Sequence, residues 1–252
     1  MAKLKDIVKF LDDYLKINEI KDDSWNGLQI EGGPEVKQIV FTENAGLDTF
    51  EKVAKEKADL MVVHHGHFWK EVNPAVRDWS KKRIEFLTKN EISLYAAHLP
   101  LDMHKEVGNN AQLLKLLGAT ITKEFGKYEG QNISWLGEFK KPIPVKEIVK
   151  KLTQKLKAKC TVLLFGPQKI KTIAVCSGGG GYSTFDEALD KKVDLYLTGD
   201  TVEMYNLAKD AKFNVIFAGH YATETLGVKA LMEVVKKKFK VKTLFIDDPT
   251  GL

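Results

Sequence analysis

The sequence predicts an α/β fold, and three observations lead to that prediction. Short apolar runs of strand length alternate with amphipathic helical segments along most of the chain, which is the pattern of β-α-β units. One such unit, residues 39–62, recurs at residues 173–197 with its Thr-Phe and Asp-Leu pairs at one offset. The 252 residues suffice for one large domain or two small ones with ample cores. We therefore interpret the repeat as two related units, with chance similarity of β-α-β segments as the alternative.

The first half of the chain opens with a helical stripe of apolar residues over 3–17, and a polar loop follows at 21–29. The run 60–63 is apolar throughout, which is typical of a parallel strand buried on both faces. Gly118 is expected to end the helix that precedes it. The predicted order is strand 38–42, helix 48–57, strand 60–63, helix 76–90, strand 93–97 and helix 110–117.

The second half alternates in the same way. Pro142 and Pro144 follow a strand and introduce a helix, while four consecutive glycines at 178–181 separate a strand from the next helix. The predicted order is strand 135–139, a helix through 157, strands 160–165 and 172–175, helix 184–191, strands 195–197 and 215–218, helix 225–238 and strand 243–246.

Composition narrows the class of protein. A hydrophobic content of 44% and a charged content of 29% are typical of a soluble globular protein, and no apolar run reaches the roughly 18 residues of a membrane helix. The chain starts in a charged amphipathic helix and has only Cys160 and Cys176, so we expect no signal peptide, a reducing compartment and a cytoplasmic location. The net charge is +5, and only the run 235–242 is strongly basic. We interpret this run either as a solvated helix end or as a stripe that holds phosphates.

All six histidines fall in or beside three short segments, 61–67, 97–104 and 219–224. In the last two, a histidine follows an apolar run and a carboxylate comes four residues later, as His98 to Asp102 and His220 to Glu224. Ligands of open α/β sheets gather at the carboxyl ends of strands, so these side chains are expected to converge. A single histidine at a strand end is more often a hydrogen-bonded structural residue, which is how we interpret His67 and His104. The matched clusters instead favour a metal site.

Local geometry sets conditions on this site. Neighbouring residues of a strand point to opposite faces, so His64 and His65 face one site only where the strand ends, and Gly66 permits that turn. Pro100 predicts a loop rather than a helix between His98 and Asp102, because the residue before proline avoids the helical region. Glu224 is expected at the start of a helix, where a carboxylate is favoured.

The donor set predicts two metal ions, because a carboxylate bridges two metals while an imidazole binds one. We predict the ligands His64, His65, Asp102, His220 and Glu224, with Glu224 as the bridge. His98 is either a sixth ligand or a residue that orients one, and Asp200 either orients a ligand or a water or caps a helix. Nitrogen and oxygen donors without a thiolate leave zinc, iron, manganese, cobalt and nickel as candidate metals.

Four motifs together resemble the Nif-three family, named for an NGG-interacting factor and also known as dinuclear metal-centre proteins or GTP cyclohydrolase I type 2 homologues. The resemblance extends over essentially the whole chain and implies the same five ligands, with His98 nearby. It implies two interlocked α/β domains of similar topology, with mixed sheets flanked by helices and the metal site between them. The domains are expected at 1–125, with 223–252 returning to it, and at 126–222. A toroidal homohexamer is also implied. The motifs are 23–29 (DSWNGLQ), 63–66 (VHHG), 98–102 (HLPLD) and 219–224 (GHYATE).

The resemblance and the ligand set favour a metal-dependent hydrolase of the GTP cyclohydrolase I type 2 homologue kind. In that hypothesis a metal-activated water attacks a nucleotide or a related heterocycle, and His98 or Asp200 shuttles protons. The alternative is a nucleic-acid-binding or transcription-associated adaptor, stabilised by its metals and using the basic run at its C-terminal end. Metal storage or delivery is a third hypothesis. A small nucleotide is therefore the expected ligand, nucleic acid stays open as a partner, and no membrane association is expected.

Overall fold

The computed structural model describes residues 1–251, which form two compact units. The first unit contains Met1–Leu101 and Val228–Asp248, and the second contains Asp102–Gly227 and residues 249–251. The chain thus passes into the second unit at Asp102 and returns to the first within helix α9 (His220–Phe239). Residues 249–251 belong to the second unit again. The division into domains 1–125 and 126–222, with 223–252 returning to the first, stays a prediction.

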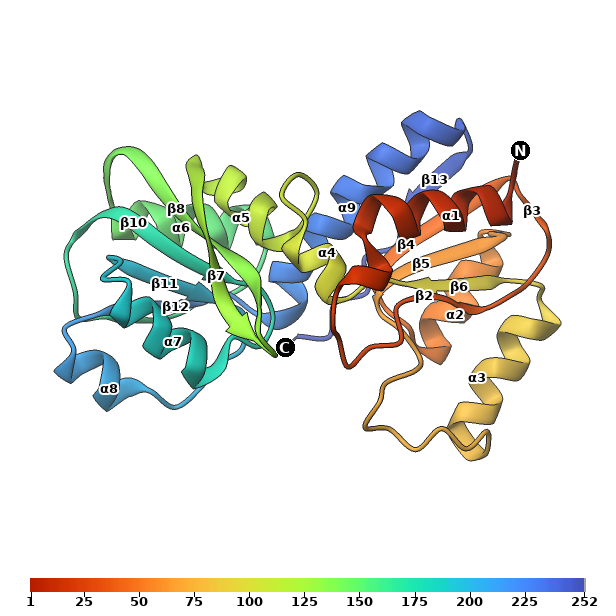
Figure 1. The fold of residues 1–252 in the computed structure, drawn as a ribbon, viewed down its shortest axis with the longest axis horizontal. Helices are drawn as coiled ribbons and strands as arrows, with labels where there is room; N and C mark the ends of the chain where they lie inside the picture. The colour runs from red at the N-terminus through yellow and green to blue at the C-terminus, as the bar shows by residue number, and fades with distance from the viewer. Residues whose placement is uncertain (252) are drawn as a thin grey trace. The chain divides into compact units, whose positions relative to one another are not determined.

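The first unit is built on a five-stranded mixed sheet in the order β13-β4-β5-β6-β2 (Figure 1). Its four strands from β13 to β6 run parallel, and β2 pairs antiparallel with β6. The carboxyl ends of β4, β5 and β6 therefore lie at one edge, together with the loop that leads into β2. The bounds are β2 Gly27–Ile30, β4 Gln38–Asn44, β5 Leu60–His65, β6 Ser93–Ala96 and β13 Lys242–Phe245, with a separate antiparallel pair of β1 Ala2–Lys3 and β3 Glu35–Val36.

Helices cover both faces of this sheet (Figure 1). α2 (Leu47–Lys55) and α3 (Asp78–Lys89) pack on one face, where Phe50 and Leu87 join a cluster of buried aliphatic side chains from β4, β5 and β6. α1 (Leu4–Leu15) lies on the other face, and its Asp12 accepts a hydrogen bond of 2.8 Å from the Tyr95 hydroxyl of β6. The strands that lead to the histidines are thereby buried on both faces. A short 3-10 helix, Ile17–Glu19, follows α1.

The second unit is built on a six-stranded mixed sheet in the order β7-β8-β10-β11-β12-β9. Its three central strands, β10, β11 and β12, run parallel, while β8 and β9 flank them in antiparallel pairs and β7 pairs antiparallel with β8. The carboxyl ends of the parallel strands again share one edge. The bounds are β7 Ala119–Tyr128, β8 Gln131–Pro144, β9 Thr161–Leu164, β10 Lys169–Cys176, β11 Leu195–Thr198 and β12 Asn214–Phe217.

The helices of the second unit also lie on both faces of its sheet (Figure 1). α5 (Asn109–Leu117) and α6 (Val145–Leu156) bury leucine and isoleucine side chains against one face. α7 (Gly181–Asp190) and α8 (Tyr205–Asp210) bury Phe185 and Ala208 against the other. Gly118 ends α5 with φ 87°, as the sequence predicts, because glycine tolerates the left-handed conformation.

The two units share one succession of elements, β-α-β-α-β with three adjacent parallel strands. In the first it is β4, α2, β5, α3 and β6, and in the second it is β10, α7, β11, α8 and β12. The Thr-Phe pairs of the sequence repeat lie at matching places, buried in α2 and α7. The prediction of two α/β units of similar topology, with mixed sheets flanked by helices, is confirmed.

Some local predictions from the sequence are wrong. Residues 99–103 form helix α4 (Leu99–Met103) instead of a loop, because Pro100 stands in the first turn, where a helix needs no N–H from it. The segment 21–29, predicted as a loop, contains the start of β2, and α9 starts at His220, five residues before the predicted position. β7 and α8 lie where no element was predicted. None of the helices in the described part of the chain is long and apolar enough to cross a membrane.

Candidate metal centre

Three imidazoles meet at the carboxyl edge of the first unit's sheet. His64 and His65 are the last two residues of β5, and His98 follows β6 directly after Ala97. The His64 ring centroid lies 4.7 Å from that of His65 and 5.0 Å from that of His98. One ligand nitrogen from each of the three lies within 4.8 Å of the others, so this group has the spacing to hold a metal ion. The strand ends at His65, which is the condition for two neighbouring histidines to serve one site.

Each of these three rings has its Nδ1 in contact with a fixed oxygen. The Nδ1 of His64 lies 2.9 Å from the carbonyl oxygen of Ala97. The Nδ1 of His65 lies 2.9 Å from the Asn44 amide oxygen and 2.8 Å from a carboxylate oxygen of Glu43. Because a carbonyl or carboxylate oxygen only accepts, Nδ1 carries the proton, and Nε2 is the nitrogen with the lone pair. This is the tautomer that a metal-binding histidine needs when an outer oxygen holds its ring.

Asp22 performs the same task for His98. One carboxylate oxygen lies 2.9 Å from the His98 Nδ1, and the other accepts 2.8 Å and 2.9 Å hydrogen bonds from the Asn26 side chain and the Leu99 N–H. Burial by itself raises the pKa of the Asp22 carboxyl, but the bonds from His98, Asn26 and Ser24 outweigh it and lower the pKa. Asp22 is thus a buried carboxylate that fixes the loop before β2 and the His98 ring together.

The second unit contributes a histidine and a carboxylate from the first turns of α9. His220 and Glu224 are four residues apart on one helix, so they share a face, and the His220 Nε2 lies 3.0 Å from a Glu224 carboxylate oxygen. The His220 Nδ1 lies 3.0 Å from the Asp200 carboxylate, beyond the end of β11. Burial lowers the pKa of His220, but Glu224 and Asp200 together overcome that and raise it to about 9.

Gly178, just beyond the end of β10, allows Glu224 and His220 to approach the strand edge. Its φ is 59°, and a Cβ there would overlap a Glu224 carboxylate oxygen and lie 2.9 Å from the His220 Nε2. The glycine run therefore makes room for this histidine–carboxylate pair. Two of its backbone N–H groups already donate to threonine hydroxyls of the same unit, at 3.0 Å each.

Asp102 is buried in the second unit with two side chains holding one of its oxygens. The Ser177 hydroxyl donates to the Asp102 Oδ1 at 2.9 Å and the Asn109 side-chain amide donates to it at 2.8 Å. Asn109 also accepts from the Gly227 N–H at 2.7 Å, which ties the carboxylate to α9. These hydrogen bonds fix the orientation of the Asp102 carboxylate, as outer hydrogen bonds do for carboxylates that bind metals.

The five predicted ligands lie in two groups, His64 and His65 in the first unit and Asp102, His220 and Glu224 in the second. Their chemistry fits a divalent cation, because imidazole nitrogens and carboxylate oxygens with held outer atoms are the donors that zinc and iron-type ions take. His98 lies with the first group, and Asp200 contacts His220. The sequence prediction missed Asp22, Glu43 and Asn44, although two of them, Glu43 and Asn44, close the strand next to the histidines.

The remaining two histidines have ordinary structural partners. The Nε2 of His67 lies 3.0 Å from the Ser80 hydroxyl, and the His104 Nδ1 accepts from two backbone N–H groups of the turn that follows α4. Both contacts agree with the prediction that these two are hydrogen-bonded structural residues.

Comparison with known proteins identifies the family. The family model for Duf34/NIF3 (NGG1p interacting factor 3) matches residues 2–250. The chain belongs to the Duf34/NIF3 family. A protein from Pyrococcus horikoshii named GTP cyclohydrolase 1 type 2 homolog is 51% identical over 249 residues, covering 98% of both chains. A Pseudomonas aeruginosa protein of the same name is 38% identical and covers 98% of this chain and 97% of its own.

Solved structures of Duf34/NIF3 relatives share the fold over the full chain. A protein called ybgI, described as of unknown function, has a TM-score of 0.93 at 34% identity and full coverage of both chains. TTHA1606 from Thermus thermophilus has a TM-score of 0.88 at 35% identity, also with full coverage. HcgD from Methanocaldococcus jannaschii, in a reduced state, has a TM-score of 0.84 at 25% identity and 98% coverage of both chains. The family resemblance predicted from the four motifs is confirmed.

Proposed function

We propose that this Duf34/NIF3 protein is a metal-dependent hydrolase that acts on a nucleotide or a related heterocycle. The supporting observation is the cluster of three imidazoles at the carboxyl edge of β4, β5 and β6, each with its Nδ1 on a held oxygen. A purely structural cluster of histidines needs no common tautomer. An Nδ1 contact to an oxygen on all three rings is what metal-ligating histidines usually show.

We propose two divalent ions as cofactors, which His64, His65, Asp102, His220 and Glu224 would hold. Bound metal would supply Lewis acidity and lower the pKa of a coordinated water. Within the protein, Asp22 holds the proton of His98 at Nδ1, and Asp200 holds the proton of His220 at Nδ1. His98 and Asp200 are therefore the groups that we propose to move protons during turnover, with His98 as a sixth ligand in the alternative assignment.

The names of the curated relatives indicate which substrate to try first. Several carry the name GTP cyclohydrolase 1 type 2 homolog, and the chain matches them over nearly their whole length. The experiment loads purified protein with zinc, iron, manganese, cobalt or nickel separately and follows GTP and other nucleotides by chromatography of the products. Metal-dependent turnover in wild-type protein, at least a hundredfold lower in Glu224→Gln, is the expected result.

The matched control is Glu233→Gln, because Glu233 is exposed on the same helix α9 and has no place in the ligand set. Its turnover should equal that of the wild-type protein. Equal turnover in Glu224→Gln and wild type, or turnover that no metal affects, would contradict the proposed function.

The family resemblance also leads us to propose that the chain assembles as a homohexamer. Light scattering coupled to size exclusion would measure six times the 28.4 kDa chain mass, and a monomer would contradict the proposal.

A second candidate function is nucleic-acid binding by the basic C-terminal part of the first unit. Lys236, Lys240 and Lys242 line one open hollow of about 520 Å³ together with Glu56 and Gln38. Lys238 is excluded from it, since its ammonium lies over the Phe10 ring at 4.6 Å. Binding that weakens steeply with salt and is lost in Lys236→Glu with Lys240→Glu would favour this function, provided that metal content stays at the wild-type level.

A further inference from the structure

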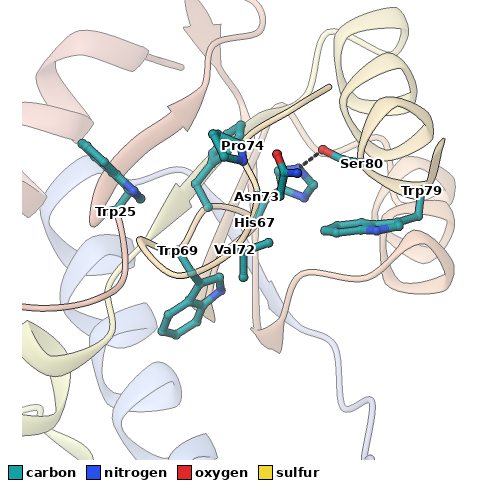
Figure 2. Close-up of a pocket in the computed structure, with 9 residues that line it drawn as sticks. Trp25, His67, Trp69, Val72, Asn73, Pro74, Trp79 and Ser80 are labelled. Carbon is teal, nitrogen blue, oxygen red and sulfur yellow. Dashed lines mark hydrogen bonds between the residues drawn. The ribbon is translucent and has the colours of Figure 1, made fainter. Parts of the chain in front are cut away.

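An aromatic hollow lies in the first unit next to the three imidazoles. Trp25, Phe68, Trp69, Val72 and Pro74 line an open hollow of about 440 Å³, which we call the aromatic hollow. The volume is in the range of small-molecule sites, about 300–1,000 Å³. Figure 2 shows Trp25, Trp69, Val72 and Pro74 with the recess that shares these walls.

Trp25 is the most informative wall of this hollow, because its ring is exposed while its backbone is fixed. The residue is 61% exposed. Its N–H donates to the Phe68 carbonyl at 3.1 Å, and its own carbonyl accepts from the Gln29 side chain at 2.7 Å. Holding a large indole in water on a rigid loop has no benefit for folding, since the apolar surface stays unburied. An exposed indole on a fixed backbone is instead a platform for stacking a flat ring.

Trp69 joins the aromatic hollow to the candidate metal centre. Its ring centroid lies 4.9 Å from that of His98 and 5.8 Å from that of His65. The indole N–H donates to the Gly66 carbonyl at 3.2 Å, which fixes the plane of the ring. A molecule that fills the hollow against Trp69 is therefore separated from the imidazoles by a single ring.

A buried polar atom lies at the recess that shares the Trp25 and Trp69 walls (Figure 2). His67 lines this recess of about 30 Å³ and is only 4% exposed. Its Nε2 contacts Ser80, whereas its Nδ1 has no hydrogen-bond partner among the residues that the structure describes. A buried nitrogen without a partner costs free energy, about 1–3 kcal/mol, unless a ligand or a water satisfies it. The nitrogen itself is buried, so the indoles and Lys70 are the groups that a molecule in the aromatic hollow would contact.

Lys70 indicates which class of molecule the aromatic hollow binds. Lys70 lines the aromatic hollow and is exposed, so its ammonium is accessible to an anionic group of a bound molecule. Flat indole walls and one accessible cation together match a heteroaromatic base that carries phosphate. A purine nucleotide supplies both a flat face for the indoles and a phosphate for Lys70, whereas a plain hydrocarbon has no anion for Lys70 to contact.

We propose that the aromatic hollow binds a purine nucleotide, with the base stacked on Trp25 and Trp69 and a phosphate at Lys70. This inference rests on the proposed function, because it assigns the subsite that presents the substrate to the metal centre. Trp25, Trp69 and Lys70 are assigned to substrate binding, and the metal ligands are unchanged by it.

The test measures binding and not turnover. Guanosine monophosphate is titrated into the metal-loaded 252-residue protein and, separately, into metal-free protein, with calorimetry as the readout. Trp25→Ala should weaken binding by about tenfold or more in both forms, and Trp25→Phe should restore most of the affinity, since phenylalanine retains a stacking face. The matched control is Tyr205→Ala, an exposed aromatic of the second unit that should leave the affinity unchanged.

Lys70 is tested by comparing two probes. Lys70→Ala should weaken guanosine monophosphate several-fold and leave guanosine unaffected, because guanosine has no phosphate for the ammonium to contact. Lys105→Ala, an exposed lysine of the second unit, is the control. A loss of the same size for both probes would overturn the assignment of Lys70 to the phosphate.

Several results would overturn the proposal. Wild-type affinity in Trp25→Ala would do so, and so would an altered oligomeric state in that variant with unchanged nucleotide binding, which would make the hollow an interface between copies of the chain. The proposed function fails separately, if no metal-loaded form turns over a nucleotide while binding still depends on Trp25. Metal content measured in each variant shows that the ligand set is intact.

Discussion

At the scale of single residues, the oxygens behind the imidazoles decide what the candidate centre can bind. A histidine ring rotates about two bonds and has two nitrogens, so the ligand type alone does not fix which nitrogen faces a metal. In this protein the Asp22 carboxylate and the Ala97 carbonyl remove that ambiguity for His98 and His64. The outer residues should therefore affect metal affinity without contacting the metal.

Replacing Asp22 tests this point. Asp22→Asn retains the shape of the side chain but removes its negative charge. One carboxylate oxygen, which accepts a hydrogen bond in the wild type, is replaced by an NH₂ group that faces either the Leu99 N–H or the His98 Nδ1. We expect metal affinity to fall by about 10- to 100-fold, because the His98 ring loses its fixed orientation. Calorimetric titration with zinc would measure it, with exposed Asp13→Asn as control. An affinity equal to wild type would show that His98 takes no part in metal binding.

The raised pKa of His220 predicts how metal affinity depends on pH. With its pKa at about 9, metal-free His220 is protonated at pH 7, so a metal must displace that proton. Affinity should therefore rise with pH by about tenfold per unit and level off near pH 9. The stability of the metal-free protein depends on pH in the opposite direction. The protonated His220 contributes its full stabilisation below the unfolded pKa of about 6.5, and this contribution is lost as the pH rises through about 9.

Chelator competition between pH 7 and 10 would measure the affinity. In Asp200→Asn one of the carboxylates that raise the His220 pKa is gone while the predicted ligands are unchanged, so the plateau should move to lower pH. A pH profile that Asp200→Asn leaves unchanged would contradict the assignment of this proton to His220.

The residues of the site differ in how far the sequence alone identifies them. His64, His65 and His220 end apolar runs in short motifs, so their types and positions already indicate strand ends. Asp22 and Glu43 carry no such mark, because their role depends on which strands become neighbours in the sheet. Asp22 lies 76 positions from His98 in the chain and reaches it only because β2 pairs with β6.

At the scale of elements, the connection from β10 to α7 sets the space available to the ligands of α9. Gly178 and Gly181 both have φ 59°, but they differ in surroundings. A Cβ at Gly178 would overlap Glu224, whereas a Cβ at Gly181 would meet nothing within 4 Å. The two glycines thus separate the effect of backbone conformation from the effect of crowding the site.

Alanine at each position gives a matched pair. Gly181→Ala should lower the free energy of unfolding by about 1–2 kcal/mol, the usual cost of a left-handed conformation, and leave metal binding intact. Gly178→Ala has the same backbone cost and should also displace Glu224 and His220, with loss of most metal affinity. Denaturant unfolding and elemental analysis measure the two effects. Equal metal content in both variants would contradict the crowding argument.

The elements near the ligands also show where local sequence rules fail. Pro100 indicated a loop, because a proline usually marks a boundary, but α4 accommodates it in its first turn. The sequence prediction began this helix at residue 225 and left His220 and Tyr221 outside it. The helix in fact includes both, and its i, i+4 geometry brings His220 onto the face of Glu224.

At the scale of the whole molecule, the two units repeat one arrangement and each brings polar side chains to the carboxyl edge of three parallel strands. The first presents imidazoles there, and the second presents Asp200, His220 and Glu224. The chain changes unit within α4, at Asp102, and again within α9, after Gly227. Alternating strands and helices and the Thr-Phe repeat made this plan predictable. Of the long β7–β8 pair, only residues 135–139 of β8 were predicted as a strand.

The proposal that both ligand groups serve one dinuclear centre predicts how metal stabilises the protein. A ligand that binds only the folded chain stabilises it by RT ln(1 + [L]/Kd), about 2.7 kcal/mol at a hundredfold excess over Kd, so metal should raise the Tm. His64→Gln and Glu224→Gln should each lose most of that rise, although they belong to different units. Combined, they should lose little more than either alone, because substitutions within one centre are not additive. Thermal unfolding with and without metal, together with metal content per chain, measures this. Independent sites would give the opposite pattern, with one metal lost in each single variant and the two losses adding in the double variant.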